Sequence, residues 1–341
     1  MGVFFMDEKN EQIYKQYRLD IKNIFKVRGF VYIEADEELY VIKPYNYSEL
    51  KASIENNVKY ALIDNNFKNV DCLIKNNNDY YISQNKYGNK FVLKKWYRGE
   101  ECDINSIDNL KRASSNLARL HKVLQEIKID NEYMSKIPIK NMINEYECYN
   151  NELKRVKKYI YNKKKKNALE MNIIKYIDRY YKQAEYYLDK LKESNYISLY
   201  KESIDNKWLC HGNYNHHSVL LEEENIATIN FDKICYGVQI FDLYCLLRKA
   251  MEKNNWDINI GINIVEAYNT EKEITMEEKE LLYIFLAYPE KYRKLVNSYF
   301  NGKKSWISIR ITEKLEELVD CELKKVQFLN YIKTVYNLNN V

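Results

Sequence analysis

Glycine and proline are scarce in this chain, which has only 8 and 3 of them among its 341 residues. A flexible linker or a low-complexity tail would need a stretch of small, polar or turn-forming residues, and no such stretch stands out. The length suffices for one large domain or for two lobes, and we expect two lobes. The first predicted hairpin contains no G-x-G-x-x-G loop of the kind that covers nucleotide phosphates.

Long apolar runs and export signals are missing as well. No uncharged apolar segment approaches the roughly 20 residues that a spanning helix needs, so we expect no membrane span. The apolar patch at Val3–Met6 is followed at once by charges and is shorter than the core of a signal peptide. Met6 stands where a myristoylation signal has serine or threonine. We therefore expect synthesis in the cytoplasm without export by that route.

The cysteines lack the spacing of a metal site or of a disulfide framework. They are odd in number and widely scattered, and none forms a C-x-x-C pair. This pattern favours a reducing compartment during synthesis. The seven positions are Cys72, Cys102, Cys148, Cys210, Cys235, Cys245 and Cys321.

A strong excess of one charge is also absent, since the net charge is only +5. Basic residues gather between Lys154 and Lys166, where we expect a helix end and a turn. A solvated helix end explains this run, and an anion or nucleic-acid patch is the alternative. Because no second basic stripe accompanies the run, we expect no nucleic-acid partner.

Tyrosine, by contrast, is abundant, with 33 residues. The chain is also rich in asparagine, lysine and isoleucine, a composition typical of an AT-rich genome, so codon bias accounts for the tyrosines. The alternative is a surface suited to oxidative tyrosine cross-linking in an assembled layer. Composition alone leaves both interpretations open.

The first 97 residues alternate between strand-like and helical patterns. Apolar positions at a helical period predict a helix over 8–25. Asn46 and Glu49 have the spacing of a capping box and predict a helix over 46–65. Runs of β-branched and aromatic residues separated by turn residues predict strands. These strands are expected at 25–33, 39–43, 70–74, 80–84 and 90–96.

After residue 97 the pattern becomes mainly helical. Long helical periodicity covers 107–124, 140–161 and 168–193, and helices dominate again from Phe241 onward. Short apolar strands flank two polar segments between these regions. We therefore predict an N-terminal domain over residues 1–97 and a helical domain over 98–341, with a hinge at Trp96–Glu100.

The two polar segments carry the chemistry. Residues 210–220 read C-H-G-N-Y-N-H-H-S-V-L, and residues 228–232 read T-I-N-F-D. They are similar to the H-G-D-x-x-x-x-N and I-D-[FW] motifs of aminoglycoside-phosphotransferase-type kinases. Relative to those motifs, Asn213 replaces the first aspartate, Ser218 replaces the asparagine, and Asn230 replaces the second aspartate.

The replaced positions are those that phosphoryl transfer needs. A carboxylate at the first position accepts the hydroxyl proton, which is typically worth ~10²- to 10⁴-fold in rate, and the amide of Asn213 cannot do so. Mg²⁺ prefers anionic oxygens, so Asn230 and Ser218 would hold it far less well than aspartate and asparagine. No catalytic residue is therefore expected to be functional.

The resemblance extends over nearly the whole chain and is closest to the spore-coat CotS-like branch of the aminoglycoside phosphotransferase and choline kinase superfamily. It implies an α+β, two-lobed protein-kinase-like fold, with a small antiparallel sheet and one main helix in the N-terminal lobe and a larger, mostly helical C-terminal lobe. Its C-terminal part rests on Ala287–Tyr292, Asn297–Phe300 and Lys304–Trp306.

The resemblance also implies roles for the residues that survive. Lys43 matches the strand lysine that reaches nucleotide phosphates, and Glu55 is its expected ion-pair partner. His211 would hold the catalytic loop, and Asp242 would brace it. Asp232 follows Asn230 by two residues, so on a strand both side chains would share a face and Asp232 could supply a displaced metal ligand.

These expectations combine into a catalytically impaired kinase-like protein, a pseudokinase. The resemblance implies synthesis in the mother cell, deposition in the bacterial spore coat and other coat proteins as partners. We expect no resident cofactor. One alternative is an active small-molecule phosphotransferase that uses ATP and Mg²⁺ with Asp232 and Lys43 in a rearranged site. Another is nucleotide bound as a structural ligand without transfer.

Overall fold

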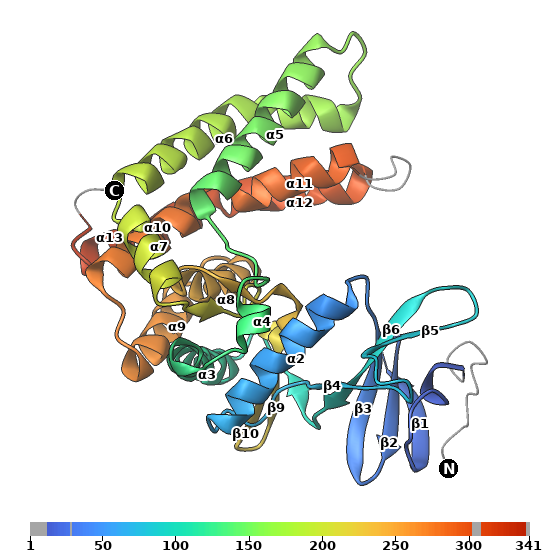
Figure 1. Ribbon diagram of the computed structural model, residues 1–341. Coiled ribbons are helices and arrows are strands. Elements are labelled where there is room, and N and C mark those ends of the chain that lie inside the picture. The colour runs from blue at the N-terminus through green and yellow to red at the C-terminus, as the bar shows by residue number, and fades with distance from the viewer. Residues whose placement is uncertain (1–11, 28, 302–307, 339–341) are drawn as a thin grey trace. The chain divides into compact units, whose positions relative to one another are not determined.

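The computed structural model of the chain describes residues 12–27, 29–301 and 308–338 (Figure 1). It divides into two compact units. One is formed by the residues up to 138 together with 209–236, and the other by 139–208 together with the residues from 237 onward. All the described strands belong to the first unit, while the second is helical. The mixed α+β composition is as expected, and the lobe boundary after residue 97 stays a prediction.

An antiparallel sheet in the order β1-β2-β3-β6-β4, with β5 also paired to β6, forms the main layer of the first unit. Valine, isoleucine, phenylalanine and tyrosine recur along these strands, as β-structure favours. The strands are β1 (Ile21–Val27), β2 (Phe30–Ala35), β3 (Glu38–Pro44), β4 (Leu73–Ile74), β5 (Ile82–Gln84) and β6 (Lys90–Trp96).

Two expectations for the N-terminal region are wrong. The helix expected over 8–25 begins at residues 8–11, which lie outside the described range, and the chain is helical only at 12–14. From Ile21 onward it is strand β1, whose Ile24 pairs with Ile33 of β2. The single strand expected over 25–33 is instead two strands, since β1 ends at Val27 and β2 begins at Phe30, and Gly29 before β2 has φ of +88°.

Helix α2 (Glu49–Asp64) connects β3 to β4 and packs against the sheet through Ala52, which lies in one apolar cluster with Leu73 and Val92. Its N-cap is Ser48, whose side chain accepts a hydrogen bond from the Lys51 amide at 3.2 Å. The expected capping box of Asn46 and Glu49 is wrong, because the Glu49 carboxylate accepts instead from the amides of residues 81 and 82.

The remainder of the first unit surrounds the two motif segments. Helix α3 (Ile107–Glu126) packs beside β8. Two small antiparallel sheets, β10-β9-β7 and β11-β8, hold the segments at both ends. The elements are β7 (Glu100–Glu101), α4 (Asn131–Met134), β8 (Leu209–Cys210), η1 (His216–Ser218), β9 (Val219–Glu222), β10 (Asn225–Thr228), η2 (Phe231–Lys233) and β11 (Cys235–Tyr236).

The helical unit contains long, amphipathic helices, as their periodicity predicts. Many of its tyrosines are buried: the rings of Tyr146 and Tyr288 stack with centroids 3.8 Å apart, and those of Tyr180 and Tyr292 at 4.2 Å. The helices are α5 (Met142–Asn162), α6 (Ala168–Glu193), α7 (Tyr196–Asp205), α8 (Ile240–Lys253), α9 (Ile258–Glu271), α10 (Met276–Ala287), α11 (Glu290–Asn301), α12 (Ser308–Asp320) and α13 (Glu322–Val335).

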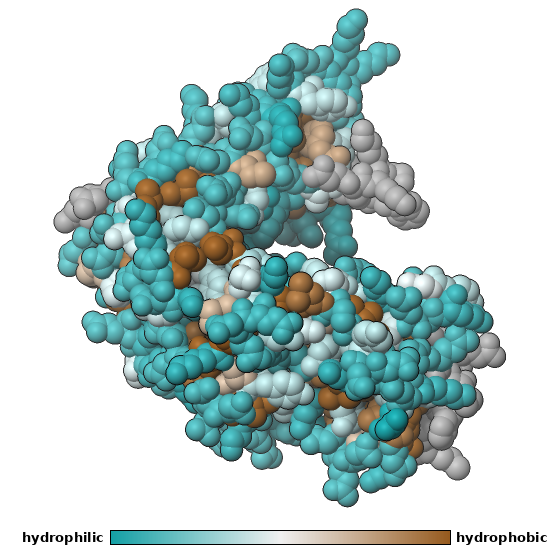
Figure 2. Space-filling view, in the orientation of Figure 1, coloured by the Kyte–Doolittle hydropathy of each residue, from teal (hydrophilic) through white to brown (hydrophobic). Residues whose placement is uncertain are grey.

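Hydrophilic residues cover most of the face shown in Figure 2, and the apolar patches on it are small and scattered. Within the described part of the chain, no helix combines the length and the apolar character that crossing a bilayer requires. Both observations agree with a composition in which 30% of the residues are charged.

Candidate functional site

A cleft of about 940 Å³ opens in the first unit between the main sheet and the two motif segments. Lys43 of β3 and Asn230 both line it, together with aromatic side chains such as Tyr32 and Trp96. Small-molecule sites are typically apolar clefts of about 300–1,000 Å³ with a few placed polar groups. The volume of this cleft lies within that range.

The amine of Lys43 lies inside this cleft, and no carboxylate of the described residues forms an ion pair with it. Its Nζ donates to Asn230 Oδ1 at 3.0 Å and lies 4.1 Å from the centroid of a Trp96 ring. Burial lowers the pKa of Lys43 to about 8. Lys43 is therefore a poorly solvated cation that an anionic ligand would stabilise.

Asn230 has a left-handed backbone conformation, with φ of 68° and ψ of 51°, which asparagine adopts more readily than most residues. Its Nδ2 donates to the His217 carbonyl at 3.0 Å, while its Oδ1 accepts from Lys43. Both ends of the amide are thus engaged. A metal ion at this position would compete with Lys43 for an uncharged oxygen.

The loop before Asn230 is held by backbone geometry and by buried groups. Gly212 has φ of +82°, and a Cβ at this position would lie 2.0 Å from the Lys233 carbonyl oxygen, so only glycine fits. Buried His211 makes a 3.0 Å hydrogen bond through Nε2 to the Ile229 carbonyl. The structure thus joins the two motif segments through His211, and its predicted loop-holding role stays a proposal.

The other two replaced positions differ in exposure. Asn213 is exposed, and its carbonyl accepts from Ser218 Oγ at 3.3 Å. Ser218 itself is buried and does not line the cleft. Its hydroxyl therefore serves the loop's own hydrogen bonding.

The expected ion pair between Lys43 and Glu55 is wrong. Glu55 of α2 is fully buried and pairs with Lys59 at 2.5 Å and with Lys94 of β6 at 2.8 Å. Asp71 completes a buried tetrad, because it pairs with the same two lysines at 2.9 and 3.0 Å. Two cations and two anions thus neutralise each other beneath the cleft. Glu55 as part of a nucleotide phosphate site stays a prediction.

The tetrad also reaches the motif. Asp71 Oδ2 accepts from the backbone amide of Asn230 at 3.0 Å, so the tetrad fixes the residue that faces Lys43. Burial alone would raise the pKa of Asp71, but Lys59 and Lys94 outweigh it and hold that pKa well below its usual range. The same two lysines keep the pKa of Glu55 low against its burial. Both carboxylates are therefore charged at neutral pH.

Asp232 does not lie on a strand, so the geometry expected for it is wrong. It belongs to the short helix η2, and its Oδ2 accepts from the Tyr47 hydroxyl at 3.1 Å. The same hydroxyl accepts from Lys233 at 2.7 Å. Its role as a metal ligand stays a prediction. Asp242 is buried in the first turn of α8 in the helical unit, and its bracing role also stays a prediction.

Reasoning from the sequence missed Lys94 and Asp71. The sequence does contain an indication of Lys94, because this lysine directly follows the apolar residues Val92 and Leu93 within the strand. A lysine at such a position needs a buried partner. The carboxylate pair that meets it comes from α2 and from the segment before β4.

The stability contributed by Lys43 should depend on pH. Because its folded pKa is about 8, the folded chain loses this proton before the unfolded chain does, and stability rises between about pH 8 and 10. Asp71 and Glu101 oppose this shift, while Lys94 and Lys59 add to burial. The measurement is the free energy of unfolding in urea of the wild type and of Lys43→Met at pH 7.5 and 9.5. The difference between the two proteins should change by about 1–2 kcal/mol in favour of the wild type as the pH rises. A difference that stays the same at both pH values would contradict this prediction.

The comparisons with known proteins agree with this geometry. The sequence family described as spore coat putative kinase YutH matches residues 10–332. Spore coat protein S of Bacillus subtilis (strain 168) is 23% identical over 172 residues. That match spans 50% of this chain and 49% of the coat protein, so the chain aligns with about half the length of this relative.

Solved structures show the fold. An aminoglycoside phosphotransferase from Alicyclobacillus acidocaldarius subsp. acidocaldarius DSM 446 superposes with a TM-score of 0.79 at 12% identity, covering 95% of both chains. Spectinomycin phosphotransferase in complex with ADP and spectinomycin gives 0.62 at 14% identity, covering 95% of this chain and 98% of that one. The predicted kinase-like fold is confirmed.

Proposed function

The chain belongs to the family of the spore coat putative kinase YutH, and from this premise we propose that it is a catalytically impaired kinase-like component of a bacterial spore coat. It would be made in the mother cell and deposited in the coat, where other coat proteins are its partners. Its surface, rather than a reaction, would then carry the function.

The observation that carries the proposal is the engaged amide of Asn230. Lys43 and the His217 carbonyl occupy its two ends, and neither Asn213 nor Ser218 provides a carboxylate nearby. Transfer of a phosphoryl group needs a base for the hydroxyl and anionic oxygens for Mg²⁺. Both requirements are unmet at the positions where the family motif would supply them.

A second candidate function is an active small-molecule phosphotransferase, and the cleft itself favours it. A 940 Å³ cleft with a desolvated lysine is a suitable nucleotide site, and Asp232 lies near enough to the motif to provide a carboxylate after rearrangement. A third alternative is a protein that binds nucleotide as a structural ligand. Lys43 would then contact a phosphate, and no phosphoryl group would be transferred.

Thermal unfolding of the purified protein with ATP, with and without Mg²⁺, tests these functions. A ligand that binds only the folded chain stabilises it by about 2.7 kcal/mol at 100 times its Kd. The impaired protein should show no magnesium-dependent shift at millimolar ATP. A shift that requires Mg²⁺ would favour the active enzyme, and one that occurs equally without Mg²⁺ would favour the structural ligand. Lys43→Met should remove either shift.

A further inference from the structure

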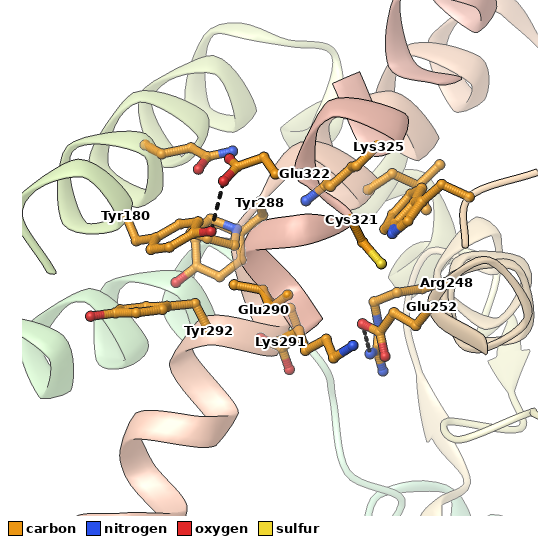
Figure 3. A pocket seen from close by; sticks show the side chains of 15 residues that line it. Tyr180, Arg248, Glu252, Tyr288, Glu290, Lys291, Tyr292, Cys321, Glu322 and Lys325 are labelled. Carbon is orange, nitrogen blue, oxygen red and sulfur yellow. Dashed lines mark hydrogen bonds and ion pairs between the residues drawn. The ribbon is translucent and has the colours of Figure 1, made fainter. Parts of the chain in front are cut away.

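Residues Tyr288–Tyr292, part of the segment that supports the family resemblance, line a pocket of about 40 Å³ in the helical unit. Arg248 of α8 and Lys325 of α13 also line it (Figure 3). Since one water needs roughly 10–15 Å³, the pocket has space for about three waters or for one compact charged group. The sequence motif thus forms part of a site distinct from the cleft.

Three basic side chains of this pocket have hydrogen-bonding capacity left. Arg248 is buried, and while its Nη1 donates to Glu252 at 2.7 Å, its Nε has no partner among the described residues. Lys325 makes one long contact, 3.4 Å to the Ala287 carbonyl. Lys291 has no carboxylate partner in the described part of the chain. A buried donor without a partner is unfavourable by about 1–3 kcal/mol, so these groups favour an acceptor in the pocket.

The acids around the pocket already have partners. Figure 3 shows Glu252 against Arg248 and Glu322 against Tyr180. Glu322 also pairs with Arg179 at 2.6 Å. Glu290 pairs with Arg293 at 2.8 Å and with Lys294 at 3.0 Å.

Two of these three carboxylates are therefore neutralised by cations that do not line the pocket. Among the described residues Lys325 and Lys291 have no ion-pair partner of their own, so the pocket has a local positive excess. An anion that entered would meet donors whose charge is not yet balanced.

We propose that this pocket binds one compact oxyanion, the phosphate or carboxylate group of a ligand, held by Lys325 Nζ and Arg248 Nε. Phosphate and carboxylate share the acceptor geometry that a guanidinium and an ammonium recognise. The proposal is independent of the cleft and holds whether or not the cleft binds nucleotide.

The titration of Lys325 supports this assignment and gives it a pH dependence. Burial lowers the pKa of Lys325 to about 8; Glu252 and Glu322 oppose the shift, and Arg248 adds to it. An anion would stabilise the ammonium form, so its affinity should fall as the pH rises above about 8. The charged or titratable groups that line the pocket beside Lys325 are Tyr180, Arg248, Glu252, Tyr288, Glu290, Lys291, Tyr292, Cys321 and Glu322.

Calorimetric titration of the full chain with inorganic phosphate and with acetate, at constant ionic strength, tests the proposal. At pH 7 at least one of the two anions should bind, and Lys325→Met should weaken that binding at least fivefold. Lys324→Met, which removes an exposed lysine from the same helix, is the matched control and should bind as the wild type does. Lys43→Met should also leave the binding unchanged, because that lysine belongs to the cleft.

Acetate provides the pH measurement, because its own charge is constant between pH 7 and 9.5. Its affinity for the wild type should fall several-fold over this range, and this result decides the matter if Lys325→Met does not fold. Binding of neither anion, or equal binding by Lys325→Met and Lys324→Met, would overturn the proposal. Loss of binding in Lys43→Met would place the anion in the cleft and overturn it as well.

Discussion

The triple variant Asn213→Asp, Ser218→Asn and Asn230→Asp should bind ATP at least tenfold more tightly with Mg²⁺ than without it, whereas the wild type should show no such dependence. The substitutions return two carboxylates and one amide to the positions where the family motif has them. Changes around a metal ligand commonly alter metal affinity by about 10- to 100-fold, which sets the expected scale.

Aspartate at 230 would lose the hydrogen bond that the amide donates to the His217 carbonyl, but two features of the structure favour it. Aspartate, like asparagine, adopts the left-handed conformation found there, and Lys43 is placed at 3.0 Å to pair with it. That pair would raise the pKa of Lys43 from about 8 and keep its amine charged. The cleft would then have a stable cation for phosphate and an anion for the metal.

Isothermal titration with ATP, with and without Mg²⁺, measures this effect. A variant with Asn77→Asp and Asn78→Asp adds the same two negative charges at exposed positions between β4 and β5, outside the cleft lining, and should behave as the wild type does. Equal affinities with and without Mg²⁺ in the triple variant would mean that the substitutions restore no metal site. No binding of ATP under either condition would mean that the cleft has lost its nucleotide site, and would count against both alternatives that include nucleotide.

Removal of Lys94 should be the most destabilising single substitution in the first unit. Lys94→Met leaves two buried carboxylates with one cation, and breaking a buried ion pair in this way typically lowers the free energy of unfolding by about 3–5 kcal/mol. That is a large part of the 5–15 kcal/mol that stabilises an ordinary domain.

The matched control for Lys94→Met is the next residue of β6. Lys95 pairs with Glu38 at 2.7 Å, but its side chain is 35% exposed, so Lys95→Met should change stability by less than about 1 kcal/mol. Urea unfolding of the two variants gives the comparison. The double variant Lys94→Met with Glu55→Gln removes one charge of each sign and should recover part of the loss. Equal stability of Lys94→Met and Lys95→Met would show that the tetrad does not hold the sheet to α2.

Much of the architecture could be predicted from the sequence because it depends on local patterns. The periodicity over 168–193 predicts α6 with the observed bounds, because the apolar face of an amphipathic helix is visible in the spacing of neighbouring residues. The strand over 90–96 is likewise as expected. The helix expected over 8–25 failed because Ile21, Ile24 and Phe25 suit a helical face and a strand equally well, and only pairing with β2 decides between them.

Part of the candidate site could likewise be predicted from the sequence. The order of the motif residues, and the amides and hydroxyl in place of acids at 213, 218 and 230, are properties of the sequence alone. The sequence likewise identified Lys43 as the lysine of the expected strand, and the structure places that lysine in the cleft.

The partner of Glu55, by contrast, was decided by the tertiary structure. Lys43 pairs with Val92 across the sheet and Lys94 pairs with Val41, so both lysines lie on the same face, where either could meet α2. The position of the helix over that face assigns Glu55 to Lys94 and leaves Lys43 to Asn230. Ion pairs between residues this far apart in the sequence depend on strand register and helix placement. The local sequence encodes neither of these. The sequence therefore determined which acidic groups of the motif are missing, but not which contacts Lys43 and Glu55 make.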